Sequence, residues 1–189
     1  MENRVKIGGF FSEAIQMGLK NALPIIVNSL LFVLTCWIPY LNLGTIIGMS
    51  KLVIKIARGE AIGMTEIFDK KNREQIGDFF MTFGLLTVGS LGGLNFILAI
   101  AWSQSILFTL DKEMGPLEAI RASYKATYGS KMPMFFGLLI LGLALSIVSG
   151  ILAAIPAIGY FLAAIISIAA SCIMVGARAY IYKTVSNNV

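Results

Sequence analysis

The residues that could perform chemistry in this chain are few, and apolar sequence surrounds them. Histidine is absent, which excludes an imidazole base and a metal site built on imidazole ligands. The cysteines, Cys36 and Cys172, lie in apolar stretches, where a free thiol acts as a small hydrophobic group. The 10 acidic residues show no spacing typical of a catalytic pair. We therefore expect no catalytic residue, no metal ion and no cofactor, and the sequence predicts that the protein is not an enzyme.

Polar side chains inside the apolar stretches are candidates for hydrogen bonding in a membrane. An unpaired polar group in hydrocarbon is costly, so each of these side chains needs a partner. The predicted polar lining consists of Asn28, Lys51, Asn95, Ser103 and Gln104. Two interpretations remain open: hydrogen bonds between helices that fix the bundle, or contacts with a solute. Lys51 has alternatives of its own, a side chain that extends to the lipid headgroups or a cationic wall of a cavity.

The composition of the chain indicates that lipid is its main solvent. Hydrophobic residues make up 57% of the 189 residues, charged residues make up 13%, and the mean hydropathy is +0.82. The charges leave uncharged stretches at residues 21–50, 79–110 and 132–177, and each is long enough to cross a hydrocarbon core of ~30 Å. The net charge of +5 fits the cytoplasmic excess of Lys and Arg in membrane proteins, and no basic run favours nucleic acid as a partner.

Helix-breaking residues lie near the middle of each uncharged stretch, at 38–44, 89–95 and 155–159. The pattern predicts three hairpins, at about 23–58, 79–110 and 133–181, with charged segments at about 1–20, 59–78 and 111–131. All charged segments then share one face, which the positive-inside rule makes cytoplasmic. We expect an all-α, polytopic helical protein of the cell membrane, a single domain over residues 1–189 with about six transmembrane helices, N-in and C-in.

The middle hairpin is the exception in length. Residues 79–110, 32 in all, divide into halves of about 16 residues, whereas a perpendicular helix needs ~20. The hairpin therefore thins the bilayer, or re-enters without crossing, or forms one long span. The last option would place the segments at 51–78 and 111–131 on opposite faces, which their similar charge does not favour.

Polar segments with a helical pattern precede the first and last hairpins, and they share residues at the same spacing. Glu13-Ala14-Ile15 precedes Lys20 as Glu118-Ala119-Ile120 precedes Lys125. This similarity indicates duplication of an interfacial amphipathic helix followed by a hairpin. The second segment predicts a helix that lies flat on the membrane, with Glu118, Arg121 and Lys125 as candidate residues for docking a cytoplasmic partner. Simple anchoring at the interface is the alternative.

Small residues recur at four-residue intervals in the last hairpin, as they do in helices that pack closely within membranes. One ladder is Gly142, Ser146, Gly150 and Ala154, and the other is Gly159, Ala163, Ser167 and Ser171. Because a short turn makes the two helices neighbours, we expect the ladders to pack against each other. Packing against another subunit is the alternative.

The order of these parts resembles that of known membrane proteins. The relevant motifs are the turn Ile38-Pro39, the step Arg58-Gly59-Glu60, Ile67-Phe68-Asp69, and the pattern Pro-x-Glu-Ala-x-Arg-x-Ser at 116–123. Together they resemble bacterial six-span integral membrane families of unknown function, and the membrane portion of some glycerophosphodiester phosphodiesterases looks similar. The resemblance implies a six-span fold. It implies no activity, because the sequence contains no phosphodiesterase catalytic domain.

Three functions fit the sequence, and they are ranked by the position of its charges. The first is a non-enzymatic membrane protein that assembles with itself, as a homo-oligomer, or with a partner protein through its charged cytoplasmic face. The second is a passive channel or transporter for a small or lipidic solute. The third is an enzyme that acts on lipid headgroups with cytoplasmic acids. The first is favoured because nearly all polar chemistry lies in the charged segments.

Overall fold

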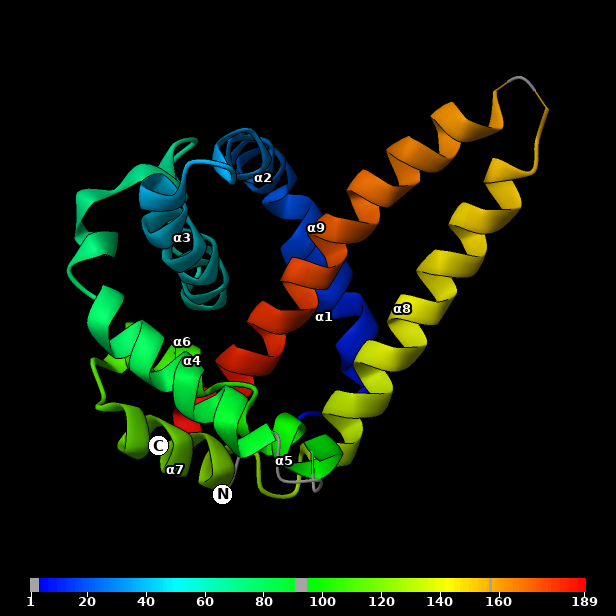
Figure 1. Cartoon of the computed structure of the whole chain (residues 1–189). Coiled ribbons are helices and arrows are strands. Elements are labelled where there is room, and N and C mark those ends of the chain that lie inside the picture. Colours follow the sequence, from blue (N-terminus) through cyan, green and yellow to red (C-terminus); the bar gives the residue numbers. More distant parts are fainter. Residues whose placement is uncertain (1–3, 91–94, 157) are drawn as a thin grey trace.

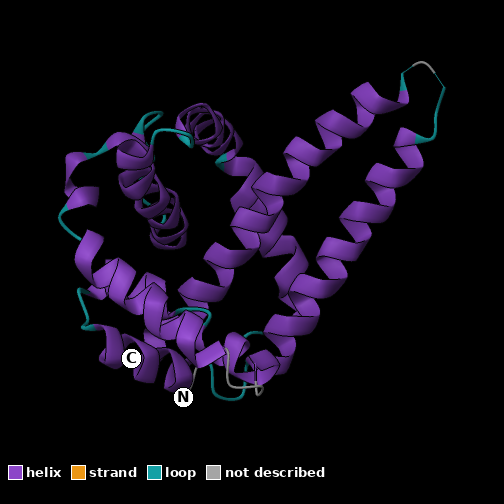
Figure 2. Ribbon diagram, in the orientation of Figure 1, coloured by secondary structure: helices purple, strands orange, loops and turns teal. Residues whose placement is uncertain are grey.

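The computed structural model describes residues 4–90, 95–156 and 158–189, except for the side chains of residues 90 and 95–97, and the described residues form helices without a strand (Figures 1 and 2). In chain order the elements are α1 (Ile7–Lys20), α2 (Ala22–Thr35), α3 (Pro39–Arg58), η1 (Glu66–Phe68), η2 (Lys70–Arg73), α4 (Ile76–Ser90), α5 (Asn95–Trp102), α6 (Ser105–Lys112), α7 (Pro116–Ala126), α8 (Lys131–Ala153), α9 (Gly159–Val185) and η3 (Ser186–Asn188). The all-α prediction is confirmed for these residues.

The longest elements, α8 and α9, form an antiparallel hairpin that projects from the rest of the molecule (Figure 1). Their 23 and 27 residues correspond to lengths of about 34 and about 40 Å, enough to cross a hydrocarbon core of about 30 Å. The helices end at the predicted break around Pro156. Beyond Leu141 on α8 and before Cys172 on α9, Gly159 is the one buried residue among those described.

The second half of α9 is packed into the bundle, chiefly against α1. The helices approach so closely that a Cβ at Gly18 would overlap the backbone of Cys172 and Ile173, and a Cβ at Gly176 would overlap the backbone of Ala14 and Gly18. Small residues four apart on both helices permit this distance. The first polar segment therefore forms a helix as expected, but its buried face packs on α9 rather than lying free at an interface.

The first hairpin, α2 and α3, turns at the predicted Ile38-Pro39 break. Pro39 occupies the first turn of α3, where its missing N–H leaves no hydrogen bond unmade. Helix α1 leads into α2 with a bend of 71°. In Figure 1, α2 and α3 are seen obliquely along their axes, whereas α8 and α9 extend across the picture, so the two hairpins are not parallel.

The segment that follows α3 folds back along that helix. We call residues 59–75 the returning segment. It begins at Gly59, whose φ of 73° ends α3 in the left-handed conformation. Most of its charged side chains are exposed, but Ile67 and Asn72 are each only 1% exposed. These two residues anchor the returning segment on α3.

The middle of the chain forms shorter helices than a full hairpin requires. The expected span at 95–110 is divided into α5 and α6, of 8 residues each, by a break at Ser103 and Gln104. Eight residues correspond to about 12 Å of helix, less than half of the hydrocarbon core. These helices pack with α7 and the ends of α8 and α9, close to both chain termini (Figure 1).

Within the described part of the chain, three helices are long and apolar enough to cross a membrane: Pro39–Arg58, Lys131–Ala153 and Gly159–Asn188. The bent pair Ile7–Lys20 and Ala22–Thr35 would make a fourth if it counts as one span, and Ile76–Gly89 is a shorter apolar helix. The prediction of a helical protein with several membrane-length helices is confirmed. Six complete spans are not found by these criteria.

Candidate functional site

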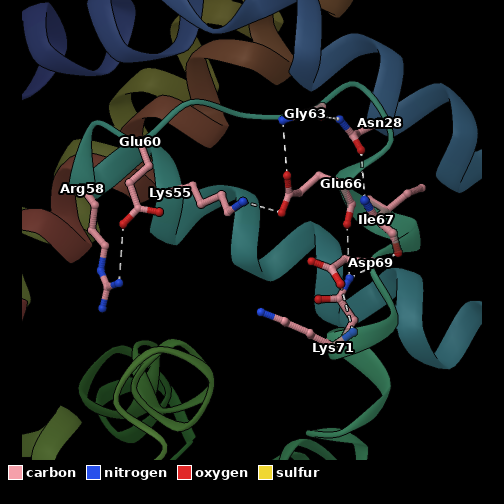
Figure 3. A network of polar contacts seen from close by, with 10 residues as sticks. Asn28, Lys55, Arg58, Glu60, Gly63, Glu66, Ile67, Asp69 and Lys71 are labelled. Atoms are coloured by element: carbon pink, nitrogen blue, oxygen red, sulfur yellow. Dashed lines mark hydrogen bonds and ion pairs between the residues drawn. The ribbon is translucent and has the colours of Figure 1, made fainter.

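The buried Asn28 side chain holds the returning segment to α2 (Figure 3). Its Nδ2 donates to the carbonyl oxygens of Pro24, at 2.8 Å, and Gly63, at 2.9 Å, and its Oδ1 accepts from the N–H of Ile67 at 3.1 Å. All three of these bonds stay within the protein. The Asn28 amide therefore ties the returning segment to α2.

An ion pair fixes the same segment to α3. Lys55 Nζ lies 2.5 Å from Glu66 Oε1, and Glu66 Oε2 accepts from the N–H of Gly63 at 3.2 Å (Figure 3). Farther along, a Cβ on Gly48 would lie 2.5 Å from the Cα of Ile67 and 2.8 Å from Asn72 Nδ2, so the segment lies directly on the backbone of α3. The contacts follow α3 from its last turn to its middle.

The returning segment also provides the charges around Lys51 and near the start of α3. Lys51 is half-buried and experiences the negative charges of Asp69, Glu74 and Glu66. The guanidinium carbon of Arg73 lies 4.8 Å from the centre of the Tyr40 ring, a cation–π contact. Lys51 thus belongs to this surface network and lines none of the cavities described below.

A second polar cluster ties together three helices far apart in sequence. Asp111, on α6, accepts from the Tyr182 hydroxyl of α9 and pairs with the Arg58 guanidinium of α3, each at 2.5 Å. The Asp111 side chain is only 5% exposed, whereas that of Arg58 is 50% exposed. Arg58 also lies 3.5 Å from Glu60. Both oxygens of Asp111 face a protein donor, so this carboxylate holds the helices together.

A half-open hollow lies between α3, α6, α8 and α9, and we call it the central cavity. Its volume is about 480 Å³. Its polar lining residues are Ser50, Ser103, Gln104 and Arg178, and its apolar lining residues are Phe32, Ile46, Met49, Val53, Ile106, Leu107, Leu138, Val175 and Ile181. Of the predicted polar lining, Ser103 and Gln104 are therefore brought together, while Asn28 and Lys51 lie elsewhere. The side chain of Asn95 lies outside the described residues.

Helix α7 is attached to the break between α5 and α6 by its small polar face. Ser123 Oγ donates to the carbonyl oxygen of Ala101 at 2.7 Å and accepts from the N–H of Gln104 at 3.3 Å. The opposite face is exposed and carries all three candidate docking residues, Glu118, Arg121 and Lys125. Exposed Leu117, Tyr124 and Tyr128 share it. Helix α8 borders this surface, because Lys131 Nζ lies 3.9 Å from the centre of the Tyr124 ring, while the three charged side chains stay exposed beside it.

The facing sides of the last hairpin are joined by a hydrogen bond between Ser149, which belongs to neither ladder, and the ladder residue Ser167. Ser149 Oγ lies 3.1 Å from Ser167 Oγ, whereas a Cβ on Gly142 or Gly150 would meet no atom within 4 Å. Between the helices lies an open hollow of about 480 Å³, the small-residue groove, lined by Gly142, Leu145, Ser146, Ser149, Gly150, Ala153, Ser167, Ala170, Ser171 and Met174. Gly159 packs in the turn, and Ala163 does not line the groove. Residues of both ladders therefore face one groove, without close contact at Gly142 or Gly150.

Sequence reasoning missed Asp111, Tyr182 and Arg178 as well as the small residues of the α1–α9 crossing. Asp111 and Arg178 border uncharged stretches and were counted only as topology signals. The crossing has a sequence signal, because Ala14 and Gly18, and Cys172 and Gly176, are each four apart. Among the described residues, no group of three or more His, Cys, Asp or Glu could hold a metal ion.

Comparison of the chain with family models, with curated proteins and with solved structures finds no match. The resemblance to six-span membrane families therefore remains a prediction from its motifs.

Proposed function

We propose that this chain is a non-enzymatic integral membrane protein that works by assembling with a second copy of itself or with a partner protein. The observation that carries the proposal is the small-residue groove. On a hairpin whose outer half is otherwise covered by large apolar side chains, this groove gathers glycines and hydroxyl groups on one side. In lipid, such residues are typical of places where another helix packs closely, since they allow backbone contact and interhelical hydrogen bonds.

The proposed membrane placement follows from the charges. In the α8–α9 hairpin, Lys131 and Lys183 lie at the open end, and no charged residue lies near the turn at 154–161. The open end also carries α7 and both termini, through bonds such as Val5 N–H to Ser130 Oγ at 3.1 Å. We place the open end in the cytoplasm by the positive-inside rule and the turn on the far side. Both ends of the chain are then cytoplasmic, the same topology that the charge pattern predicts.

The number of crossings is part of the proposal. Six spans follow from the sequence pattern alone. The short helices α5 and α6 support a smaller number, with the middle of the chain within the cytoplasmic leaflet beside α7. Single cysteines test this placement in intact cells. We expect a membrane-impermeant thiol reagent to label a cysteine at Tyr160 and not at Arg121; the reverse pattern would overturn the placement.

Assembly through the groove is tested by cross-linking in membranes. In a variant with Cys36→Ser and Cys172→Ala, a single cysteine at Ser146, in the groove, is compared with one at Leu143, which is 54% exposed outside it. We expect a short thiol cross-linker to join Ser146→Cys to another chain, identified by mass spectrometry, and to leave Leu143→Cys uncoupled.

Filling the groove provides the matched control. Gly150→Leu places a leucine side chain in the groove, whereas Ala144→Leu places the same side chain on the exposed lipid side of α8. Only Gly150→Leu should abolish cross-linking. Equal cross-linking from Ser146 and Leu143, or an assembly indifferent to Gly150→Leu, would rule out the groove as the contact.

The charged face is the proposed docking surface for a cytoplasmic partner. Arg121 and Lys125 are exposed, and the α7 face opposite them is fixed by buried Ala119, Ala122 and Ser123. Reversal of both basic residues to Glu should therefore leave insertion unchanged and release a partner that copurifies with the chain. Retention of the partner would exclude this surface.

A passive channel or transporter is the alternative. It was expected to use Asn28, Lys51 and Gln104 along one route. Asn28 instead bonds to the returning segment, Lys51 lies in the field of that segment's carboxylates, and Gln104 lines the central cavity. We therefore rank transport second.

A further inference from the structure

The central cavity lies below the charged end of the α8–α9 hairpin. Leu138 lines it from α8, 7 residues after Lys131, and Arg178 lines it from α9, 7 residues before Val185. Seven residues of helix correspond to about 10 Å. In the proposed placement, both helices therefore bring the cavity to the same depth, inside the cytoplasmic leaflet and below its headgroups.

Arg178 is the unexplained charge in the wall of this cavity. Its neighbours Ala177 and Ala179 are 0% exposed, yet Arg178 itself is exposed, on the side where α9 lines the cavity with Val175 and Ile181. These lining positions are three residues apart and share one face of the helix. No carboxylate of the described residues pairs with Arg178. A cation at this depth of a membrane without an anion is costly, which marks it as a functional position.

Gln104 provides a second, independent observation. The residue lines the cavity and is only 6% exposed, and its enclosed Oε1 has no hydrogen-bond partner among the described residues. Its Nε2 donates to Ser103 Oγ at 3.0 Å. Because this oxygen is enclosed, a ligand in the cavity reaches the amide only when the side chain turns toward it. Rotated by half a turn, it would accept from Ser103 and donate to an oxyanion.

The remaining wall is apolar. Helix α3 contributes Ile46, Met49 and Val53 from one face, and Phe32 and Leu138 face them from α2 and α8. The volume of about 480 Å³ falls within the range of about 300–1,000 Å³ that is usual for small-molecule sites. The cavity thus combines a cation, a buried amide and an apolar wall, which fits a molecule with an oxyanion at one end and a hydrocarbon chain at the other.

We infer that the central cavity binds a single-chain anionic lipid, whose oxyanion headgroup contacts Arg178 and Gln104 and whose acyl chain lies along the apolar wall. A lipid is favoured over a free anion because a small hydrated ion does not reach this depth of a bilayer, whereas an acyl chain provides the driving force for doing so. The inference rests on the proposed membrane placement but not on assembly, since the small-residue groove lies on the outer half of the hairpin.

The test measures equilibrium binding of radiolabelled oleoyl lysophosphatidic acid to the full chain purified in a neutral maltoside detergent. We expect saturation near one lipid per chain. Monooleoylglycerol, with the same acyl chain but no anion, should bind at least about tenfold more weakly, since a hydrogen bond to a charged group is lost. Inorganic phosphate should not displace the lipid. Equal binding of monooleoylglycerol, or displacement by phosphate alone, would overturn the inference.

Variants locate the site. Arg178→Gln should weaken lysophosphatidic acid binding by at least about tenfold, while Arg121→Gln, which removes the same charge from the exposed face of α7, should leave the affinity unchanged. An unchanged affinity of Arg178→Gln overturns the inference. If that variant does not fold, Leu138→Trp, which fills the cavity and keeps the cation, must lower the affinity to the same extent.

The same variants separate this inference from assembly. Loss of lipid binding in Leu138→Trp with normal Ser146→Cys cross-linking would support the cavity and leave the groove intact. Lipid binding that persists in both Arg178→Gln and Leu138→Trp would exclude the cavity whatever the outcome of cross-linking.

Discussion

Replacement of Asn28 by alanine tests whether the returning segment is held by a few buried hydrogen bonds. The substitution removes the bonds from Asn28 to Gly63 and Ile67. The Ile67 N–H then stays buried without this acceptor, which costs about 1–3 kcal/mol. The Gly63 carbonyl adds less to this cost, because Gly63 is exposed and its carbonyl can bond to water. We expect release of the segment to become easier by about 2–3 kcal/mol, or roughly 30- to 150-fold in the opening equilibrium.

Limited proteolysis measures this opening. Lys70, Lys71 and Arg73 lie in the segment and provide tryptic sites that must leave their short helical turn to be cut. When opening is fast compared with cleavage, the cleavage rate follows the population of the open form. Asn28→Ala should therefore raise the rate of cutting at 70–73 by the same factor.

The chain offers a matched control in Asn42, a second asparagine of the same hairpin. Its Oδ1 is buried without a partner, so Asn42→Ala removes an unpaired group and should leave cleavage unchanged or slow it slightly. Equal cleavage rates for Asn28→Ala, Asn42→Ala and the unmodified chain would refute the view that Asn28 holds the segment.

Three further predictions concern packing and stability. Gly176→Val should lower the free energy of unfolding in detergent by about 3 kcal/mol or more, because the new Cβ meets the backbone of α1. Gly84→Val is the control: a Cβ there meets nothing within 4 Å, so it should lower the free energy of unfolding by about 1 kcal/mol or less. Thermal denaturation of the two variants compares them. Asp111→Asn should lower thermal stability by about 1–3 kcal/mol, since an amide cannot replace the carboxylate toward both Tyr182 and Arg58; unchanged stability would show that this cluster contributes nothing. Gly59→Ala should lower the free energy of unfolding by about 1 kcal/mol, because alanine disfavours the φ of 73° at this position. Faster tryptic cleavage of the returning segment would show this loss.

Local patterns predicted the elements of this fold well. The breaks at Ile38-Pro39 and Ile155-Pro156 end helices where proline and glycine were expected to end them, and the uncharged stretches coincide with α2–α3 and α8–α9. Such signals are local, since they depend on backbone chemistry within a few residues. The order of interfacial segment and hairpin also recurs, and the matched Ala14 and Ala119 are both fully buried.

The arrangement of those elements was not predictable from the same patterns. The charged residues of the returning segment suggest that it lies in solvent. Its neutral residues Ile67 and Asn72 are nevertheless buried against Gly48 and hold the segment on α3, and no local pattern reveals that contact. The candidate site was predictable only in part for the same reason. Gln104 was recognised because an amide within apolar sequence is unusual, whereas Arg178 was interpreted as the end of a span, because its exposure toward a cavity depends on helices α3 and α8, which are distant in sequence.

The close crossing of α1 and α9 has a consequence for how the protein is made. Gly18 is synthesised early, but its packing partner Gly176 leaves the ribosome 158 residues later, as the difference of their numbers shows. At a translation rate of about 5–20 residues per second, α1 waits roughly 8 to 30 seconds for the helix that covers it. During that interval its buried face, which includes Phe10 and Ala14, needs lipid, the insertion machinery or a chaperone as a temporary cover. A ribosome that stalls before α9 would leave a nascent chain with this face open, a natural substrate for membrane quality control.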